Sequence, residues 1–115
     1  MKNSTIKKKY SEIQRWMADN LEQKCEGCGQ PSNLSHSHLI SKSICKRKGL
    51  YDLIYDRKNI RYHCILGGNL GKPCHNIWEG NDPVLRSKMM DYQENSEFII
   101  EKMGLIFWQN NYNNG

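Results

Sequence analysis

The chain has 115 residues, enough for one compact domain but not for separate catalytic and binding domains. Its 37% of hydrophobic residues is low for a globular protein, so we expect a sparse core that needs support beyond apolar burial. The 17 Lys and Arg against 12 Asp and Glu give a net charge of +5, which favours an anionic partner, chiefly nucleic acid. No apolar run could span a bilayer and no apolar segment follows the basic N-terminus, which predicts a cytoplasmic protein without a membrane partner.

The first predicted element is an amphipathic helix over residues 10–22. Its apolar side chains recur at helical spacing on one face, at Ile13, Trp16, Met17 and Leu21. The Lys-rich residues 1–9 before it are expected to be a frayed arm. Turn-forming residues then dominate the stretch over 23–35.

Two strand-like segments lie in the middle of the chain. Residues 36–44 have the composition of a short strand, and residues 59–65 that of a second one. The stretch between them is basic up to Gly49 and then ambiguous between a short helix and a loop. A loop with three glycines over 66–73 follows the second strand and leads into a helix that begins at Cys74.

The last third of the chain is predicted to be helical. An Asn-Asp cap followed by Pro83 is typical of a helix start, and Gly104 is typical of a helix end. A helix is therefore expected from Pro83 toward Met103, with a break near Asn95. The polar residues 109–115 are expected to be a disordered tail.

Four of the five cysteines form two pairs that suit a metal ion. Only two residues separate Cys25 from Cys28, so both thiolates can face one ion. Cys64 and Cys74 supply a second pair across nine intervening residues. Four thiolates at about 2.3 Å from Zn²⁺ make a closed, structural site. Such a site contributes about 10–16 kcal/mol of folding free energy in small zinc modules, which would support a sparse core.

Two other interpretations of the cysteines are open. His63 or His75 could replace one thiolate in a mixed site, or Cys64 and Cys74 could be ordinary buried residues without a metal. A redox role for the first pair lacks the βαβ context that such motifs occupy. Cys45 is the leftover thiol, with no function implied.

All four histidines lie between residues 36 and 75, interleaved with the cysteines. An imidazole such as His38, held through its second nitrogen, can deprotonate water near neutral pH. His75 directly follows Cys74, whose bound thiolate would fix the backbone there. Glu79 is one helical turn further on the same face, so His75 and Glu79 can share one metal ion.

With these features the sequence resembles the HNH endonucleases, which have the ββα-metal fold. The resemblance covers about residues 23–80 and looks closest to small phage and prophage members. It is carried by the C-x2-C knuckle, His38-Leu39-Ile40 within Ser37 to Ser43, Asn59-Ile60, Cys64, and Cys74-His75-Asn76.

The resemblance implies a role for each matching residue. His38 would be the general base that activates water for attack on phosphorus, and Asn59 would keep that base oriented. His75 would hold a catalytic Mg²⁺ or another divalent ion, with Glu79 at the position of the last motif residue. Where many members carry an Asp ligand before the base, this chain has Ser37, and His36 is the alternative donor.

Basic residues flank the predicted base and Asn59, and they suit contacts with a phosphate backbone. They are Lys42, Lys46, Arg47, Lys48, Arg57, Lys58 and Arg61. Such contacts predict salt-sensitive binding. No segment resembles a groove-reading recognition helix, so low sequence specificity for DNA is expected. Trp78 and Trp108 are expected in the core, and His63 is expected to be structural or a DNA contact.

We therefore predict a single α+β domain over 1–115, with a small ββα-metal core and a structural zinc site. Its parts are an N-terminal helix (10–22), the zinc and ββα-metal core (23–80), C-terminal helices (81–108) and a disordered tail (109–115). The predicted function is metal-dependent hydrolysis of DNA in a bacterial or phage-infected cell. The alternatives are an inactive zinc-ribbon DNA-binding module, favoured by Ser37, and a structural zinc protein that acts through protein partners.

Overall fold

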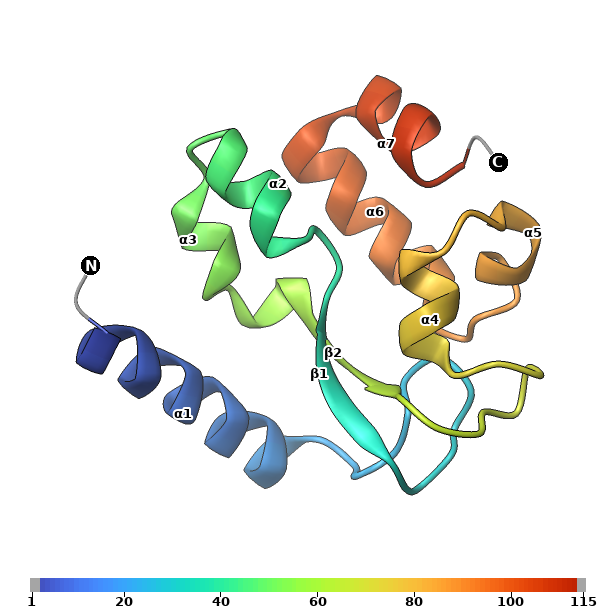
Figure 1. The fold of residues 1–115 in the computed structure, drawn as a ribbon, viewed down its shortest axis with the longest axis horizontal. Coiled ribbons are helices and arrows are strands. Elements are labelled where there is room, and N and C mark those ends of the chain that lie inside the picture. The colour runs from blue at the N-terminus through green and yellow to red at the C-terminus, as the bar shows by residue number, and fades with distance from the viewer. Residues whose placement is uncertain (1–2, 114–115) are drawn as a thin grey trace.

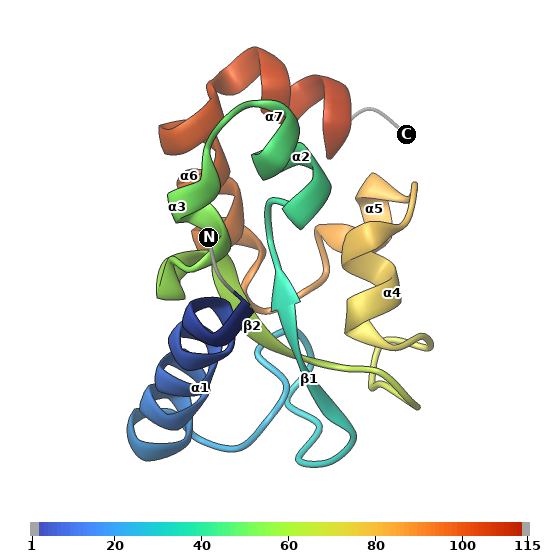
Figure 2. The ribbon, with the colours of Figure 1, turned by 60° about the vertical axis from the view of Figure 1, so that its left-hand side comes forward.

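The computed structural model describes the backbone of residues 3–113 and the side chains of residues 8–113. The two strands form a sheet between α1 on one side and α4 on the other, and further helices gather where β1 ends (Figure 1 and Figure 2). In chain order the elements are α1 (Asn3–Asn20), β1 (Leu34–His38), α2 (Lys42–Arg47), α3 (Tyr51–Ile54), the 3-10 turn η1 (Arg57–Asn59), β2 (Ile60–Cys64), α4 (Cys74–Glu79), α5 (Pro83–Arg86), α6 (Tyr92–Met103) and α7 (Leu105–Asn111). This is a small α+β architecture, as predicted.

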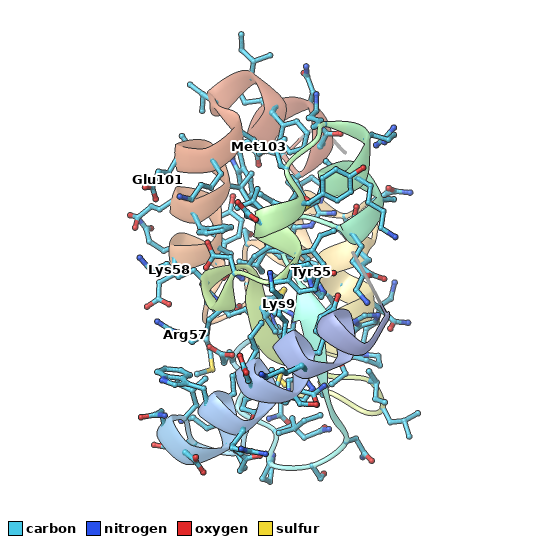
Figure 3. The ribbon with its side chains drawn as sticks, turned by 90° about the vertical axis from the view of Figure 1, so that its left-hand side faces the viewer. Lys9, Tyr55, Arg57, Lys58, Glu101 and Met103 are labelled. Atoms are coloured by element: carbon cyan, nitrogen blue, oxygen red, sulfur yellow. The ribbon has the colours of Figure 1, made fainter. Side chains whose placement is uncertain are left out.

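Helix α1 begins earlier than the apolar pattern predicts. It is helical from Asn3, so the expected frayed arm is wrong for residues 3–9, while residues 1–2 lie outside the described part. Lys8 and Lys9 are good helix formers, and Lys9 Nζ lies 5.1 Å from the ring centre of Tyr55 (Figure 3). Further along, Met17 is fully buried against β2. The helix is therefore continuous from Asn3, and its described side chains pack from Lys9 to Met17.

The first strand begins and ends earlier in the chain than predicted, so the residues after His38 form a turn and a helix. β1 runs antiparallel to β2 with His38 opposite Ile60, and it stops there instead of continuing to residue 44. Leu39 and Ile40 are both buried, so strand alternation does not hold beyond His38. The strand ends because Ser41 Oγ caps α2 by accepting a hydrogen bond from the backbone N–H of Ile44.

The C-terminal helices start and stop at the predicted cap and glycine but break elsewhere. Asp82 caps α5, and Gly104 ends α6 with a φ of 91°. The break falls at residues 87–91, and Asn95 lies buried inside α6. The expected disordered tail is wrong as far as residue 113, because α7 continues to Asn111 and Tyr112 packs in the core. Residues 114–115 lie outside the described part.

The main core joins the last helices to the cysteines and the turn after β1. Trp78 and Trp108 are buried there, as predicted, and Tyr112 stacks on Trp108 with ring centres 5.5 Å apart. This aromatic cluster packs α4 against α7, so it fixes the helix that carries His75. None of the helices in residues 3–113 is long and apolar enough to cross a membrane.

Candidate functional site

The four cysteines predicted to bind a metal converge in the structure. The Sγ atoms of Cys25, Cys28, Cys64 and Cys74 all lie within 4.8 Å of one another, and all four side chains are buried. The Sγ atoms of Cys28 and Cys64 are 3.8 Å apart. Ligands at about 2.3 Å from a tetrahedral Zn²⁺ are separated by about 3.8 Å, so this spacing fits. The cluster could therefore hold a structural metal ion such as zinc.

Glycines allow the backbone to close around this cluster. A Cβ at Gly27 would lie 2.7 Å from the Sγ of Cys74, so the knuckle approaches α4 too closely for a side chain. Gly68 has a φ of +100°, and a Cβ there would overlap the carbonyl oxygen of Lys72. These two glycines allow the long loop after Cys64 to bring Cys74 close to Cys25 and Cys28.

Hydrogen bonds already favour one thiolate within the cluster. The thiol of Cys74 donates to Cys25, which lowers the pKa of Cys25 to about 4 and raises the pKa of Cys74. The backbone N–H of Cys64 also donates to the Sγ of Cys25, at 3.3 Å. The backbone donor can stabilise negative charge on sulfur in a metal-bound cluster, whereas the Cys74 thiol must lose its proton to become a ligand.

Neither histidine considered for a mixed site belongs to the cluster. His63 is fully buried, and its Nε2 donates to Asp91 Oδ2 at 2.8 Å. Burial raises the pKa of Asp91, but the hydrogen bond and charge of His63 outweigh it and lower that pKa. A buried ring cannot contact DNA, so His63 links β2 to the start of α6. Cys45 is buried apart from the cluster, 3.7 Å from the carbonyl of Ile40.

His38 lies at the end of β1 with its ring fixed. Its Nε2 is 2.9 Å from the carbonyl oxygen of Ile54. A carbonyl only accepts, so Nε2 carries the proton and Nδ1 of the neutral ring is free to take one up. Burial lowers the pKa of His38, and Lys42 lowers it further, against the raising effect of the Ile54 hydrogen bond. The ring is therefore held neutral in one tautomer.

Asn59 fixes the backbone that follows His38. It is fully buried, and its Oδ1 accepts from the N–H of Ile40 at 2.7 Å. Its Nδ2 donates to the carbonyls of Ile40 and Leu53, at 3.0 Å and 2.9 Å. The second of these carbonyls belongs to α3, which also supplies the acceptor for His38. Asn59 therefore ties the turn after β1 to the helix that orients the histidine.

Helix α4 carries a second polar pair. The Nε2 of His75 lies 3.3 Å from Glu79 Oε2, since the two share a helix face as their spacing predicts. On its other side, Nδ1 of His75 is 2.8 Å from the Oγ of Ser37. Ser37 is buried on β1, opposite in direction to its neighbour His38. The serine therefore orients the ring of His75 and leaves Nε2 facing Glu79.

These side chains line one cavity of 310 Å³ at the exposed edge of β1. It brings together His38, Ser37, Lys42, His75 and Glu79. His36 borders the same cavity, but its ring is exposed and packs 5.2 Å from that of Tyr62. Among the described residues, only the cysteine cluster brings three or more metal-ligating side chains close enough to share an ion, so His36 does not join His75 and Glu79 in such a group.

The residues predicted to contact phosphate differ in how accessible their charged groups are. Lys46 and Arg47 are exposed on α2, whereas Arg57 stacks on Trp16 of α1 with 3.9 Å between its guanidinium carbon and the ring centre. Arg61 turns inward and donates from Nε to Asn95 at 3.1 Å. The others keep exposed side chains, with the ammonium groups of Lys42 and Lys48 near aromatic rings and Lys58 on η1.

Sequence reasoning missed Arg86 and Tyr112, which line a neighbouring cavity together with His38 and Glu79. Both are held by hydrogen bonds that the folded chain brings together, Tyr112 to Leu39 and Arg86 to the carbonyls of Trp78, Gly80 and Tyr112. An Arg after a helix start and a Tyr among asparagines carry no local sign of burial.

Comparison of the chain with protein-family models, curated proteins and solved structures finds no match.

Proposed function

We propose that this protein is a metal-dependent endonuclease that hydrolyses DNA phosphodiester bonds, with His38 as the general base. One observation carries the proposal. A half-buried histidine, held neutral with one nitrogen free, shares a cavity with a His-carboxylate pair on a helix. A base beside a divalent-ion site is what phosphodiester hydrolysis by an activated water requires.

His75 and Glu79 suit a divalent ion as donors. Adjacent ligands of an octahedral ion at about 2.1 Å lie about 3.0 Å apart, and the two atoms here are 3.3 Å apart. Ser37 fixes the ring of His75 through its other nitrogen, which is how proteins orient a ligating imidazole. An ion such as Mg²⁺ bound there would stabilise the negative charge that develops on the leaving oxygen.

The remaining parts support the same reaction. His38 takes a proton from water through Nδ1, and the Ile54 carbonyl holds the resulting charged ring by accepting from Nε2. Lys42 at the cavity provides a positive charge for the substrate phosphate. Zinc in the cysteine cluster would fix the end of β2 to the start of α4, and so hold His75 in place relative to β1.

A second candidate is a DNA-binding module that does not cut. It is favoured by Ser37, a poor metal ligand where an Asp would complete the ion site. Two side-chain donors then leave most of the ion's shell to water and phosphate. Such a module would bind DNA with or without Mg²⁺.

The test is cleavage of supercoiled plasmid by the zinc-loaded protein with Mg²⁺ or Mn²⁺. We expect the wild type to cut and His38→Ala to lose about 10²–10⁴-fold in rate, the usual contribution of a general base. His36→Ala is the matched control, because it removes an exposed histidine from the same strand and should cut like the wild type.

Binding without cleavage of duplex, branched or single-stranded DNA would favour the module. Equal cutting by His38→Ala and the wild type would place the base elsewhere.

A further inference from the structure

The carbonyl group next to His38 receives two buried side-chain donors. The Leu39 oxygen accepts from Trp78 Nε1 at 3.0 Å and from the hydroxyl of Tyr112 at 2.8 Å. Leu39 itself is 1% exposed. A carbonyl has two lone pairs, so these two donors saturate it and fix its direction. One donor comes from α4 and the other from the residue that ends α7.

The same residue is held from the opposite side. The N–H of Leu39 donates to the backbone oxygen of Asn59 at 2.8 Å, and the N–H of Ile40 donates to the Asn59 side chain. Both peptide groups that flank Leu39 are therefore fixed by buried partners. The backbone after His38 has no freedom unless one of these bonds opens.

Arg86 joins the two donors to each other. It is 3% exposed, and its Nε donates to the carbonyl of Trp78 at 3.0 Å. Its terminal nitrogens donate to the carbonyls of Tyr112 and Gly80. The guanidinium thus ties the end of α4 to the end of α7, as five donors in a planar fork allow.

This network adjoins the cavity of the proposed reaction. A second cavity, of 270 Å³, is lined by Trp78, Arg86 and Tyr112, and also by His38 and Glu79. The last two also line the first cavity. Tyr112 therefore lies beside both the proposed base and the helix that carries the ion ligands.

We propose that Tyr112 is a positioning residue for the hydrolysis, because its hydroxyl fixes the Leu39 carbonyl and thereby holds His38 in register with His75 and Glu79. The inference rests on the proposed function, and it places a required part of the site beyond residues 23–80. Burial raises the pKa of Tyr112 to about 12, so the hydroxyl remains a donor at working pH.

Tyr112→Phe tests the hydroxyl alone. The ring keeps its stack on Trp108, at 5.5 Å and an angle of 13°, so the fold should survive. Tyr92→Phe is the matched control, since that ring packs 5.7 Å from the same tryptophan and its hydroxyl has no hydrogen bond among the described residues. We would measure kcat and KM on plasmid with the zinc-loaded full chain, together with amide hydrogen exchange of Leu39 and Ile40.

The expected result for Tyr112→Phe is a fall in kcat on the order of 10-fold, since small misplacements of reacting groups are costly. KM should stay within about twofold and the two amides should exchange faster, while Tyr92→Phe matches the wild type. Equal kcat for Tyr112→Phe and the wild type would overturn the inference, and so would equal losses in both variants, which would indicate packing alone.

Failure of the proposed function gives a different result. The wild type would then not cut, and the amide exchange, which needs no activity, would still read the effect of the hydroxyl on the turn. Unchanged exchange in Tyr112→Phe would overturn the positioning role on its own.

Discussion

At the scale of single residues, the tautomer and the pKa of His38 are determined by the residues packed around it more than by its sequence neighbours. The Ile54 carbonyl selects its tautomer, and burial with Lys42 keeps its pKa low. Asn59 fixes the turn after His38 through two hydrogen bonds with Ile40 and ties it to α3 through a third with Leu53. The proposed role of general base requires a ring that is unprotonated and oriented before substrate binds, and these contacts provide both.

The proposed cleavage should depend on pH through the protonation of His38. A group with a lowered pKa stays in its unprotonated, reactive form to lower pH than an ordinary histidine. The rate should therefore rise from acid pH with a midpoint below about 6.5, the ordinary value for histidine. Lys42→Gln removes a cation that disfavours protonation, so its midpoint should move to higher pH than that of the wild type.

Lys46→Gln makes the same change of charge at an exposed position that does not line the cavity, and it should leave the midpoint in place. The measurement is the single-turnover rate of plasmid cleavage across pH, with the divalent ion saturating at each value. A wild-type midpoint at or above that of an ordinary histidine would contradict the expectation.

At the scale of elements, the cysteine cluster joins three segments that are distant from one another in the sequence. The knuckle, the end of β2 and the first residue of α4 meet there, and the loop between the last two is long. We expect one zinc ion per chain, and Cys74→Ser should lose it and unfold. The free energy of unfolding should fall by several kcal/mol, because zinc supplies about 10–16 kcal/mol of folding free energy in small modules.

Cys45→Ala is the control for this variant, since Cys45 is equally buried but lies outside the cluster. It should keep its zinc and most of its stability. Zinc content per chain and thermal unfolding, with and without a chelator, measure both variants. Full zinc occupancy in Cys74→Ser would contradict the four-thiolate site.

The elements that sequence predicts best are those with local signals. The second strand, the start of α4, the cap before Pro83 and the stop at Gly104 all depend on neighbouring residues. Asn95 is different, because it resembles a helix breaker but is buried in α6 and accepts a hydrogen bond from Arg61. Long-range contacts outweigh local preference there.

The candidate site divides in the same way. The pairing of His75 with Glu79 follows from helical spacing, and the knuckle from its two-residue gap. The bond from Ser37 to His75 joins residues 38 positions apart, and that from Tyr112 to Leu39 spans 73. No local pattern encodes these two contacts, so the supports from Ser37 and Tyr112 could not be predicted, whereas the resemblance did indicate the support from Asn59.

At the scale of the whole molecule, the net charge of +5 can attract an anionic partner only where its cations are exposed. Arg57 is stacked on α1, and Arg61 is committed to the interior. Lys46 and Arg47 remain exposed on α2, which directly follows the turn after His38. In the proposed function, these exposed cations on α2 are the ones that attract the DNA backbone toward the cavity.

The salt dependence of DNA binding distinguishes local charge from net charge. For each DNA phosphate that a protein cation neutralises, the slope of log affinity against log salt steepens by about 0.9. Replacing both Lys46 and Arg47 by Gln should therefore make the slope shallower by about 1.8. Replacing Lys24 and Lys88 by Gln removes the same charge from segments outside α2, before β1 and after α5, and should change the slope by much less. Fluorescence anisotropy with a labelled duplex over a salt series measures both. Equal changes would mean that the molecule attracts DNA through its total charge, without a bound orientation that places the backbone at His38.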